Sequence, residues 1–106
     1  MHPSLKFNRE VNGMSVNHVE GEDKGHVMLY ALSTCGWCKK TKGLLEEMKV
    51  DFYYTNVDQL EGDERMEALE DLKKWNPRRS FPSLVINNSQ CIIGYDENQI
   101  RKALKP

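Results

Sequence analysis

The fold is decided by one stretch of the sequence, Val27-Met-Leu-Tyr-Ala-Leu-Ser-Thr-Cys-Gly-Trp-Cys-Lys-Lys40. Its apolar run over residues 27–32 predicts a buried β-strand that is covered by helices on both faces. The run stops at the Ser-Thr pair, Cys35 and Cys38 follow, and a helical pattern then begins. Two cysteines three positions apart at the start of a helix lie on one face of its first turn. The pair is therefore close enough to form a disulfide or to share a metal ion.

Cys35 is predicted to lie where unpaired backbone N–H groups and the positive end of the helix dipole point. Both favour a thiolate, and the pKa of a free cysteine, about 8.5, falls to about 3.5–7.5 in C-x-x-C sites of this kind. Each unit of such a pKa shift represents about 1.4 kcal/mol in favour of the thiolate. We expect Cys35 to be an exposed nucleophile that attacks a disulfide, and Cys38, one turn deeper, to resolve the mixed disulfide that results.

A metal or iron–sulfur site that uses Cys35 is the competing interpretation. Zinc needs four ligands, and one C-x-x-C pair supplies two of them. The remaining candidate ligands are scattered along the chain with no second ligand pair: Cys91, His2, His18 and His26. We therefore expect no metal site within one chain, while a cluster shared between two chains stays open.

Length and composition limit the class of protein. A chain of 106 residues forms one domain with a single core. Its formal net charge of −1 lacks the basic excess of a nucleic-acid-binding surface. We expect a cytoplasmic chain, because no apolar run approaches the length of a membrane span and Met1-His-Pro-Ser4 does not resemble a signal peptide. Three cysteines are too few for a disulfide scaffold, and a C-x-x-C pair in a reducing compartment is typically redox-active or metal-binding.

The first 25 residues are polar and rich in turn-forming residues, and we treat 1–25 as an extension of a domain over 26–106. Asn12-Gly13 between partly alternating segments is the strongest short signal for a β-hairpin. It predicts strands over about Lys6–Val11 and Met14–Val19. The alternative is a disordered leader.

Beyond the first strand, the patterns predict a helix over 37–49, a strand over 51–57, a helix over 62–75, strands over 84–86 and 90–93, and a last helix that begins at Asp96 or Glu97. A strand–helix–strand unit implies parallel strands with a right-handed crossover. The last two strands, joined by Asn87-Asn-Ser89, form an antiparallel hairpin. The order is β-α-β-α-β-β-α. Core residues of the second helix are predicted at helical spacing: Met66, Leu69, Leu72 and Trp75.

Three motifs at their separations resemble the glutaredoxins, most closely the small glutaredoxin-like hydrogen-donor redoxins. They are Thr34-Cys-Gly-Trp-Cys38 after a strand, Ser80-Phe-Pro82 before the third strand, and Gly94-Tyr-Asp-Glu97 before the last helix. The resemblance runs from about Gly25 to the C-terminus. It implies a thioredoxin fold, an α/β architecture with a four-stranded mixed sheet and helices on both faces, to which the N-terminal hairpin is an extension. It also implies dithiol–disulfide exchange.

The resemblance assigns roles residue by residue. Cys35 matches the family's nucleophile and Cys38 its resolving cysteine. Arg79-Ser-Phe-Pro82 matches the family's Arg-Thr-Val-Pro, which implies a cis peptide before Pro82 and a main chain at Phe81 that pairs with a bound peptide. Gly94-Tyr-Asp-Glu97 matches the loop and helix start that hold the glutathione carboxylate. The expected substrate- or glutathione-binding residues are Thr34, Trp37, Arg79, Phe81, Pro82, Tyr95 and Asp96.

The chain departs from the family pattern at three places. Leu32 stands where glutaredoxins carry a lysine that helps to bind glutathione, Cys-Gly-Trp-Cys replaces Cys-Pro-Tyr-Cys, and Ile93 replaces the first Gly of a Gly-Gly pair. The electron donor therefore stays open between glutathione, another low-molecular-weight thiol and a flavoenzyme reductase. We expect a monomer without a tightly bound cofactor, whose clients include ribonucleotide reductase or peroxidase-type enzymes.

Several side chains have two interpretations. Trp37 is either a flat platform for substrate or a packing residue. Arg78 and Arg79 either bind a carboxylate or are solvated loop charges. Cys91 is expected to be a small buried hydrophobe, and regulation through its thiol is the alternative. The histidines are expected at the surface, and the acidic residues of the second helix form a solvated face.

Overall fold

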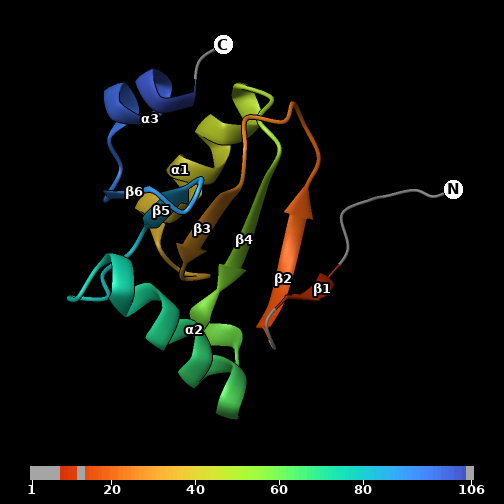
Figure 1. Cartoon of the computed structure of the whole chain (residues 1–106), viewed down its shortest axis with the longest axis vertical. Helices are drawn as coiled ribbons and strands as arrows, with labels where there is room; N and C mark the ends of the chain where they lie inside the picture. The colour runs from red at the N-terminus through yellow and green to blue at the C-terminus, as the bar shows by residue number, and fades with distance from the viewer. Residues whose placement is uncertain (1–7, 12–13, 105–106) are drawn as a thin grey trace, which may run out of the picture.

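The computed structural model of the chain describes residues 8–11 and 14–104 (Figure 1). The expected order of elements is present, with ends that differ from the predicted ones by a few residues at most. The elements are β1 (Asn8–Val11), β2 (Met14–Val19), β3 (Val27–Ala31), α1 (Gly36–Glu47), β4 (Phe52–Asn56), the short 3₁₀ helix η1 (Val57–Gln59), α2 (Gly62–Trp75), β5 (Ser83–Ile86), β6 (Gln90–Ile93) and α3 (Glu97–Leu104).

The strands form one mixed sheet in the order β1-β2-β4-β3-β5-β6. β3 and β4 are parallel and α1 connects them, while β3 with β5 and β5 with β6 are antiparallel. These four strands are the predicted sheet of a thioredoxin fold. The predicted N-terminal hairpin adds two strands to these four, so the sheet has six strands.

The hairpin is confirmed as β1 and β2, which pair antiparallel from Asn8↔Asn17 to Val11↔Met14. Its predicted turn at 12–13 and the predicted start of its first strand at 6–7 lie outside the described residues. β2 then pairs antiparallel with β4, from Asn17↔Tyr54 to Val19↔Phe52. Without the hairpin, the outer edge of β4 would expose unpaired backbone N–H and C=O groups. The hairpin occupies that edge, as Figure 1 shows on the right of the sheet.

Two layers of helix cover the sheet. Alternate residues of β3 point to opposite faces, so Val27, Leu29 and Ala31 join one buried cluster while Met28 and Tyr30 join another. The first cluster takes side chains from α1 and α3, and the second takes them from α2. This explains why every residue of β3 is buried. In the part of the chain that is described, no helix is long and apolar enough to cross a membrane.

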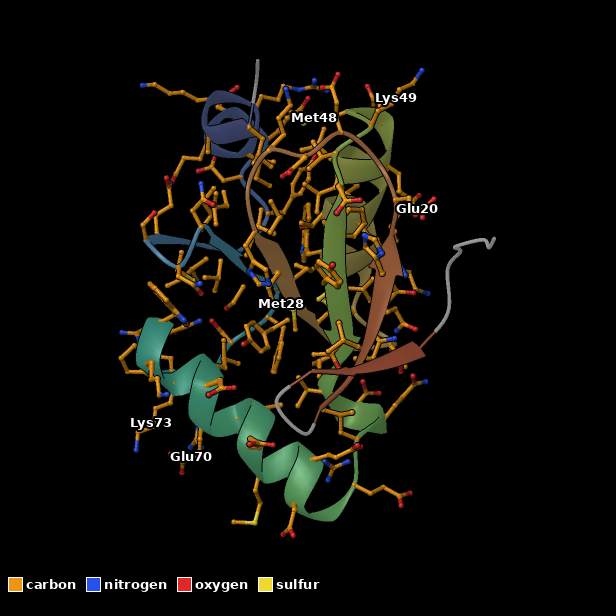
Figure 2. All side chains as sticks on the ribbon, turned by 45° about the vertical axis from the view of Figure 1, so that its right-hand side comes forward. Glu20, Met28, Met48, Lys49, Glu70 and Lys73 are labelled. Carbon is orange, nitrogen blue, oxygen red and sulfur yellow. The ribbon has the colours of Figure 1, made fainter. Side chains whose placement is uncertain are left out.

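The predicted core of α2 is wrong at Met66, whose side chain is 65% exposed. Ala68 and Leu72 are the fully buried residues of this helix, and Leu69 and Trp75 pack partly against the same cluster. At about 100° per residue, Met66 lies about 160° around the helix from Ala68, which is its opposite face. Figure 2 shows Glu70 and Lys73 also projecting away from the sheet.

The expectation that the histidines are surface residues is wrong for His18. Its side chain is 16% exposed, and its Nε2 lies 3.0 and 2.9 Å from the two carboxylate oxygens of Asp51. The ring stacks on Tyr53 at a centroid distance of 4.4 Å. The backbone N–H of Gly21 donates to the same carboxylate at 3.0 Å. These contacts exist because β2 docks on β4, a pairing that the local sequence does not specify. His26 is exposed, and His2 lies outside the described residues.

Candidate active site

The chain leaves the buried strand β3 and turns directly into α1 at Cys35. The Cys35 N–H donates to the Leu32 carbonyl at 3.2 Å, and the Cys35 carbonyl accepts from Lys39 N–H at 3.1 Å. Cys35 is the N-cap residue of α1, with an extended backbone (φ −87°, ψ 117°). The first cysteine therefore lies where the sequence places it, at the end of the helix with free N–H groups.

The two sulfurs of the C-x-x-C pair lie in different environments. The Cys38 N–H donates to the Cys35 Sγ at 3.1 Å, so the sulfur of Cys35 serves as the helix cap. Cys35 is partly exposed, whereas Cys38 is 2% exposed and belongs to the core cluster under α1 and α3. Burial, and then the hydrogen bond with Cys35, raise the pKa of the Cys38 thiol to about 12. Cys38 is therefore a protonated thiol at neutral pH, and Cys35 presents the sulfur that is accessible.

The loop before β5 runs beside the end of β3 that leads to Cys35. In the antiparallel register Tyr30 pairs with Ser83, so the residues just before β5 lie beside the end of β3 that leads to Cys35. The Phe81–Pro82 peptide is cis, as the resemblance implied. Phe81 packs against the same core cluster as Cys35. The C-x-x-C segment and the loop around Pro82, nearly fifty residues apart in the sequence, thus pack against the same part of the core.

An aromatic surface flanks the cysteines. Trp37 is 59% exposed, and its ring stacks on Tyr95 at a centroid distance of 5.8 Å and an interplanar angle of 25°. The Nζ of Lys40 lies 5.3 Å from the Trp37 ring centroid and 5.8 Å from that of Tyr95. Tyr95 in turn packs against the core cluster that contains Cys38. The exposure of Trp37 argues against its interpretation as a partly buried packing residue, while its role as a platform for substrate stays a prediction.

A small pocket lies on the inner side of the site, with a volume of about 60 Å³. It is lined by Ala31, Leu32, Ser33, Cys38, Lys39, Lys42 and Asn56. A volume of this size holds a few water molecules, not a tripeptide.

Comparison with known protein families shows to which family this site belongs. The family model for glutaredoxin matches residues 27–91, which include both cysteines and the cis-proline loop. The chain belongs to the glutaredoxin family.

Two solved structures and one curated protein are among the relatives that it resembles. A glutaredoxin from Methanosarcina mazei Go1 is 47% identical, with a TM-score of 0.81, over 92% of this chain and 96% of that one. Methanoredoxin from Methanosarcina acetivorans is 46% identical, with a TM-score of 0.79, over 81% of this chain and 90% of that one. A glutaredoxin-like 8.6 kDa protein from the rubredoxin operon of Clostridium pasteurianum is 28% identical over 79 residues, 74% of this chain and 97% of that protein. Membership and the Cys35–Cys38 motif together support a thiol–disulfide redox role.

Two of the expected binding residues of this glutaredoxin have other contacts within the chain. The carboxylate of Asp96 accepts from the Gln99 N–H at 3.0 Å and from Gln99 Nε2 at 2.9 Å, so it caps the start of α3. The Tyr95 hydroxyl donates weakly to Glu97 at 3.4 Å. Thr34, directly before Cys35, is exposed, and so is Arg79 in the loop that leads to Pro82. Among the described residues, neither Arg78 nor Arg79 takes part in an ion pair.

Sequence reasoning did not find the link between Ser33 and Asp58. The Ser33 N–H donates to Asp58 at 2.8 Å and the Ser33 hydroxyl donates to its other oxygen at 2.5 Å. These two bonds lower the pKa of the Asp58 carboxyl. They connect the segment just before Cys35 to η1, the short helix that follows β4. No local pattern relates residues 25 positions apart, so the sequence alone carried no signal for this contact.

The ligand set for a metal on one glutaredoxin chain is limited. Among residues 8–11 and 14–104, no group of three or more His, Cys, Asp or Glu side chains is placed to hold a metal ion. Cys91 lies partly buried on β6, away from the C-x-x-C pair, and burial raises the pKa of its thiol. Cys35 and Cys38 would be the two sulfur ligands that this chain contributes to any metal shared with another molecule.

Proposed function

We propose that this glutaredoxin is an oxidoreductase that reduces protein or small-molecule disulfides with the Cys35–Cys38 dithiol. The observation that best supports the proposal is that the two sulfurs differ in exposure and in hydrogen bonding. Cys35 Sγ is accessible and accepts the Cys38 N–H, the kind of hydrogen bond that stabilises a thiolate. Cys38 is buried as a protonated thiol behind it.

The first step is attack of the Cys35 thiolate on one sulfur of the client disulfide. A bond forms between Cys35 Sγ and that sulfur, the client S–S bond breaks, and the second client sulfur leaves as a thiolate that takes up a proton. The free N–H groups at the start of α1 stabilise the negative charge on Cys35 before the attack. Because Cys38 is protonated and shielded, it does not compete for the client.

The second step resolves the mixed disulfide. Cys38 loses its proton to solvent and attacks Cys35 Sγ, which forms the Cys35–Cys38 bond and breaks the mixed disulfide. The client sulfur that was bonded to Cys35 leaves as a thiolate and takes up a proton. The two electrons that reduce the client come from the dithiol, which is left as a Cys35–Cys38 disulfide. The hydrogen bond from the Cys38 N–H to Cys35 Sγ supports this step, because it holds the backbone of Cys38 close to the sulfur that Cys38 attacks.

The surface around Cys35 supports binding of a peptide. Phe81 would pair through its main chain with an extended client segment. Trp37 and Tyr95 offer an exposed aromatic face, and Arg79 offers an unpaired guanidinium to a carboxylate of a client or a thiol donor. Thr34 and Pro82 border the same surface.

We also propose the wider setting of this reaction. The dithiol is regenerated by glutathione, another low-molecular-weight thiol or a flavoenzyme reductase, and no cofactor is held tightly. Leu32 in place of the family's lysine weakens the case for glutathione. Clients of the ribonucleotide-reductase or peroxidase type, a cytoplasmic location, a monomeric state and no role in nucleic-acid or membrane binding complete the proposal.

The experiment is an insulin-reduction assay on protein purified without oxygen, with a visible spectrum and a metal determination on the same sample. The proposal expects a colourless, zinc-free protein that reduces insulin. Glutathione and a flavoenzyme reductase, supplied separately, then show which donor restores the reduced form. Bound iron–sulfur without disulfide reductase activity would replace this proposal with its alternative, a cluster-carrying module that uses Cys35.

A further inference from the structure

Asn76 is a buried polar residue at the end of α2, and its side chain is not used by the helix. It is the C-cap residue, it is 2% exposed, and its own N–H donates to the Leu72 carbonyl at 2.8 Å. A buried amide is costly unless its donors and acceptor are paired. The partners of this side chain therefore indicate what it holds in place.

All of these partners belong to the loop before β5 or to its first residue. Asn76 Nδ2 donates to the hydroxyl of Ser80 at 2.9 Å and to that of Ser83 at 3.0 Å. Asn76 Oδ1 accepts from the Arg78 N–H at 3.1 Å. Both amide donors and the acceptor are satisfied, which is full use of this side chain.

The main chain of Asn76 and a serine complete the network. The Asn76 carbonyl accepts from the Arg79 N–H at 2.8 Å, and Arg79 adopts a positive φ of 53°. The Ser83 hydroxyl donates to the Ser80 carbonyl at 2.8 Å. The loop is thus fixed at its start, its middle and its end, and Arg79 and Phe81 are carried between the fixed points.

A purely local role as a helix cap would give a different pattern. A C-cap side chain that only ended the helix would bond the last carbonyls of α2. The Asn76 side chain bonds residues two, four and seven positions further along the chain instead. The contacts therefore relate α2 to the loop that faces the cysteines.

We propose that Asn76 is a positioning residue for disulfide exchange: its amide holds Arg79 and the Phe81 main chain at the place where a client peptide meets Cys35. The inference rests on the proposed function, because it concerns how that site receives a peptide. It predicts a selective defect. A client that pairs with the Phe81 main chain needs the loop in place, whereas a small disulfide without a peptide main chain needs only Cys35.

The test compares two disulfides with one set of variants. For Asn76→Ala we expect KM for a disulfide-bridged peptide to rise about tenfold, the scale expected when a binding segment is displaced. Reduction of hydroxyethyl disulfide, which has no peptide main chain, should change by less than about twofold. In Asn76→Asp the carboxylate still accepts from the Arg78 N–H and can accept from the Ser80 hydroxyl, while the Ser83 hydroxyl keeps its bond to the Ser80 carbonyl. KM for the peptide should therefore move part of the way back toward the wild-type value.

Two further variants keep the test decisive if Asn76→Ala folds poorly. Ser80→Ala removes one partner of the amide from an exposed position, and a smaller rise in KM for the peptide is expected. The matched control is Ser89→Ala, whose hydroxyl donates to the Ile86 carbonyl at 3.2 Å in the β5–β6 turn, at the other end of β5. It should leave both substrates unaffected.

The outcomes separate the two proposals. The positioning role would be overturned if the Asn76→Ala variant lost activity equally on both disulfides. It would also be overturned if KM for the peptide were unchanged in Asn76→Ala and Ser80→Ala. Activity of the wild type would in either case leave the proposed function standing. A wild-type protein that reduces neither disulfide would overturn the proposed function itself. Failure of Asn76→Asp to recover the KM of the peptide would also count against the inference.

Discussion

The main-chain N–H of Cys38 donates a hydrogen bond to the sulfur of Cys35 across 3.1 Å, and the two sulfurs also differ in exposure. The sulfur that accepts the N–H caps the helix and is partly exposed, while the sulfur on the donor residue is buried in the core. A nucleophile must be ionised and accessible, and a resolving thiol must wait until a mixed disulfide is present. The arrangement separates these two requirements between neighbouring residues.

The first prediction concerns those two roles. Cys35→Ser should abolish disulfide reduction, because a serine hydroxyl does not replace a thiolate in exchange. Cys38→Ser should retain the first step and accumulate a covalent adduct between Cys35 and the client. Intact-protein mass spectrometry after incubation with a peptide disulfide measures the adduct.

Cys91→Ser is the matched control, since it removes a partly buried thiol outside the C-x-x-C pair. It should reduce the client at about the wild-type rate. An adduct that forms on Cys38 in the Cys35→Ser variant would reverse the assigned roles.

The second prediction concerns stability at alkaline pH. Burial raises the pKa of Cys38 from 9.0 to about 12, and burial followed by the charges of Asp71 and Cys91 raises that of Tyr30 from 10.0 to about 12. The unfolded chain therefore loses these protons first. Stability is retained below about pH 9 and declines toward pH 12, with a slope of at most about 1.4 kcal/mol per pH unit for each group.

Urea denaturation of the reduced protein at several pH values measures this decline. Tyr30→Phe removes one of the two groups, so its decline above pH 10 should be shallower than that of the wild type. A free energy of unfolding that stays constant between pH 9 and 11 in the wild type would contradict the prediction.

The third prediction concerns the exposed aromatic surface. Trp37→Ala should raise KM for a peptide disulfide by about tenfold, because stacking contacts of one aromatic ring contribute about 0.5–1.5 kcal/mol beyond the area they bury. The free energy of unfolding should change by less than about 1 kcal/mol, since 59% of this residue is exposed.

Met66→Ala provides the comparison, because Met66 is similarly exposed, at 65%, on the outer face of α2. It should change neither KM nor stability appreciably. If both variants bind the peptide as the wild type does, Trp37 is not part of the client surface.

The fourth prediction concerns the attachment of the hairpin. Asp51→Ala removes the partner of His18 and of the Gly21 N–H, so it should destabilise the protein by about 1–3 kcal/mol. His18→Ala should destabilise it by a similar amount, because the ring also stacks on Tyr53. Urea denaturation of both single variants and the double variant measures the coupling.

The loss in free energy of unfolding of the double variant should be clearly smaller than the sum of the losses of the two single variants, because the two residues share one interaction. Losses that add within about 0.3–0.5 kcal/mol would show that His18 and Asp51 stabilise the protein independently.

The sequence alone was sufficient to predict those elements whose structure depends on residues close together in the chain. The buried strand that leads into Cys35, the end of α2 at Asn76 and the β5–β6 hairpin follow from local periodicity and turn residues, and all were predicted closely. The cis peptide before Pro82 followed from the family resemblance and not from the residues themselves.

Contacts between distant segments could not be predicted in this way. The pairing of β2 with β4 depends on which sheet edge is open, and the His18–Asp51 contact depends on that pairing. Helical spacing predicted Met66 and Leu72 as core residues of α2; Leu72 is buried, whereas Met66 is exposed and Ala68 is buried in its place. The Asn76 network joins a helix end to a strand start through side chains whose spacing forms no recognised motif.

The pairing of β2 with β4 has a consequence for how copies of this chain meet one another. β4 is hydrogen-bonded on both sides, to β3 and to β2, so no foreign strand can extend the sheet at that position. A strand from another molecule would have to add at β1 or β6, the two outer strands. Both are four residues long, which makes each a poor template for intermolecular β-pairing. The hairpin thereby protects the folded protein against edge-to-edge aggregation, independently of any redox chemistry.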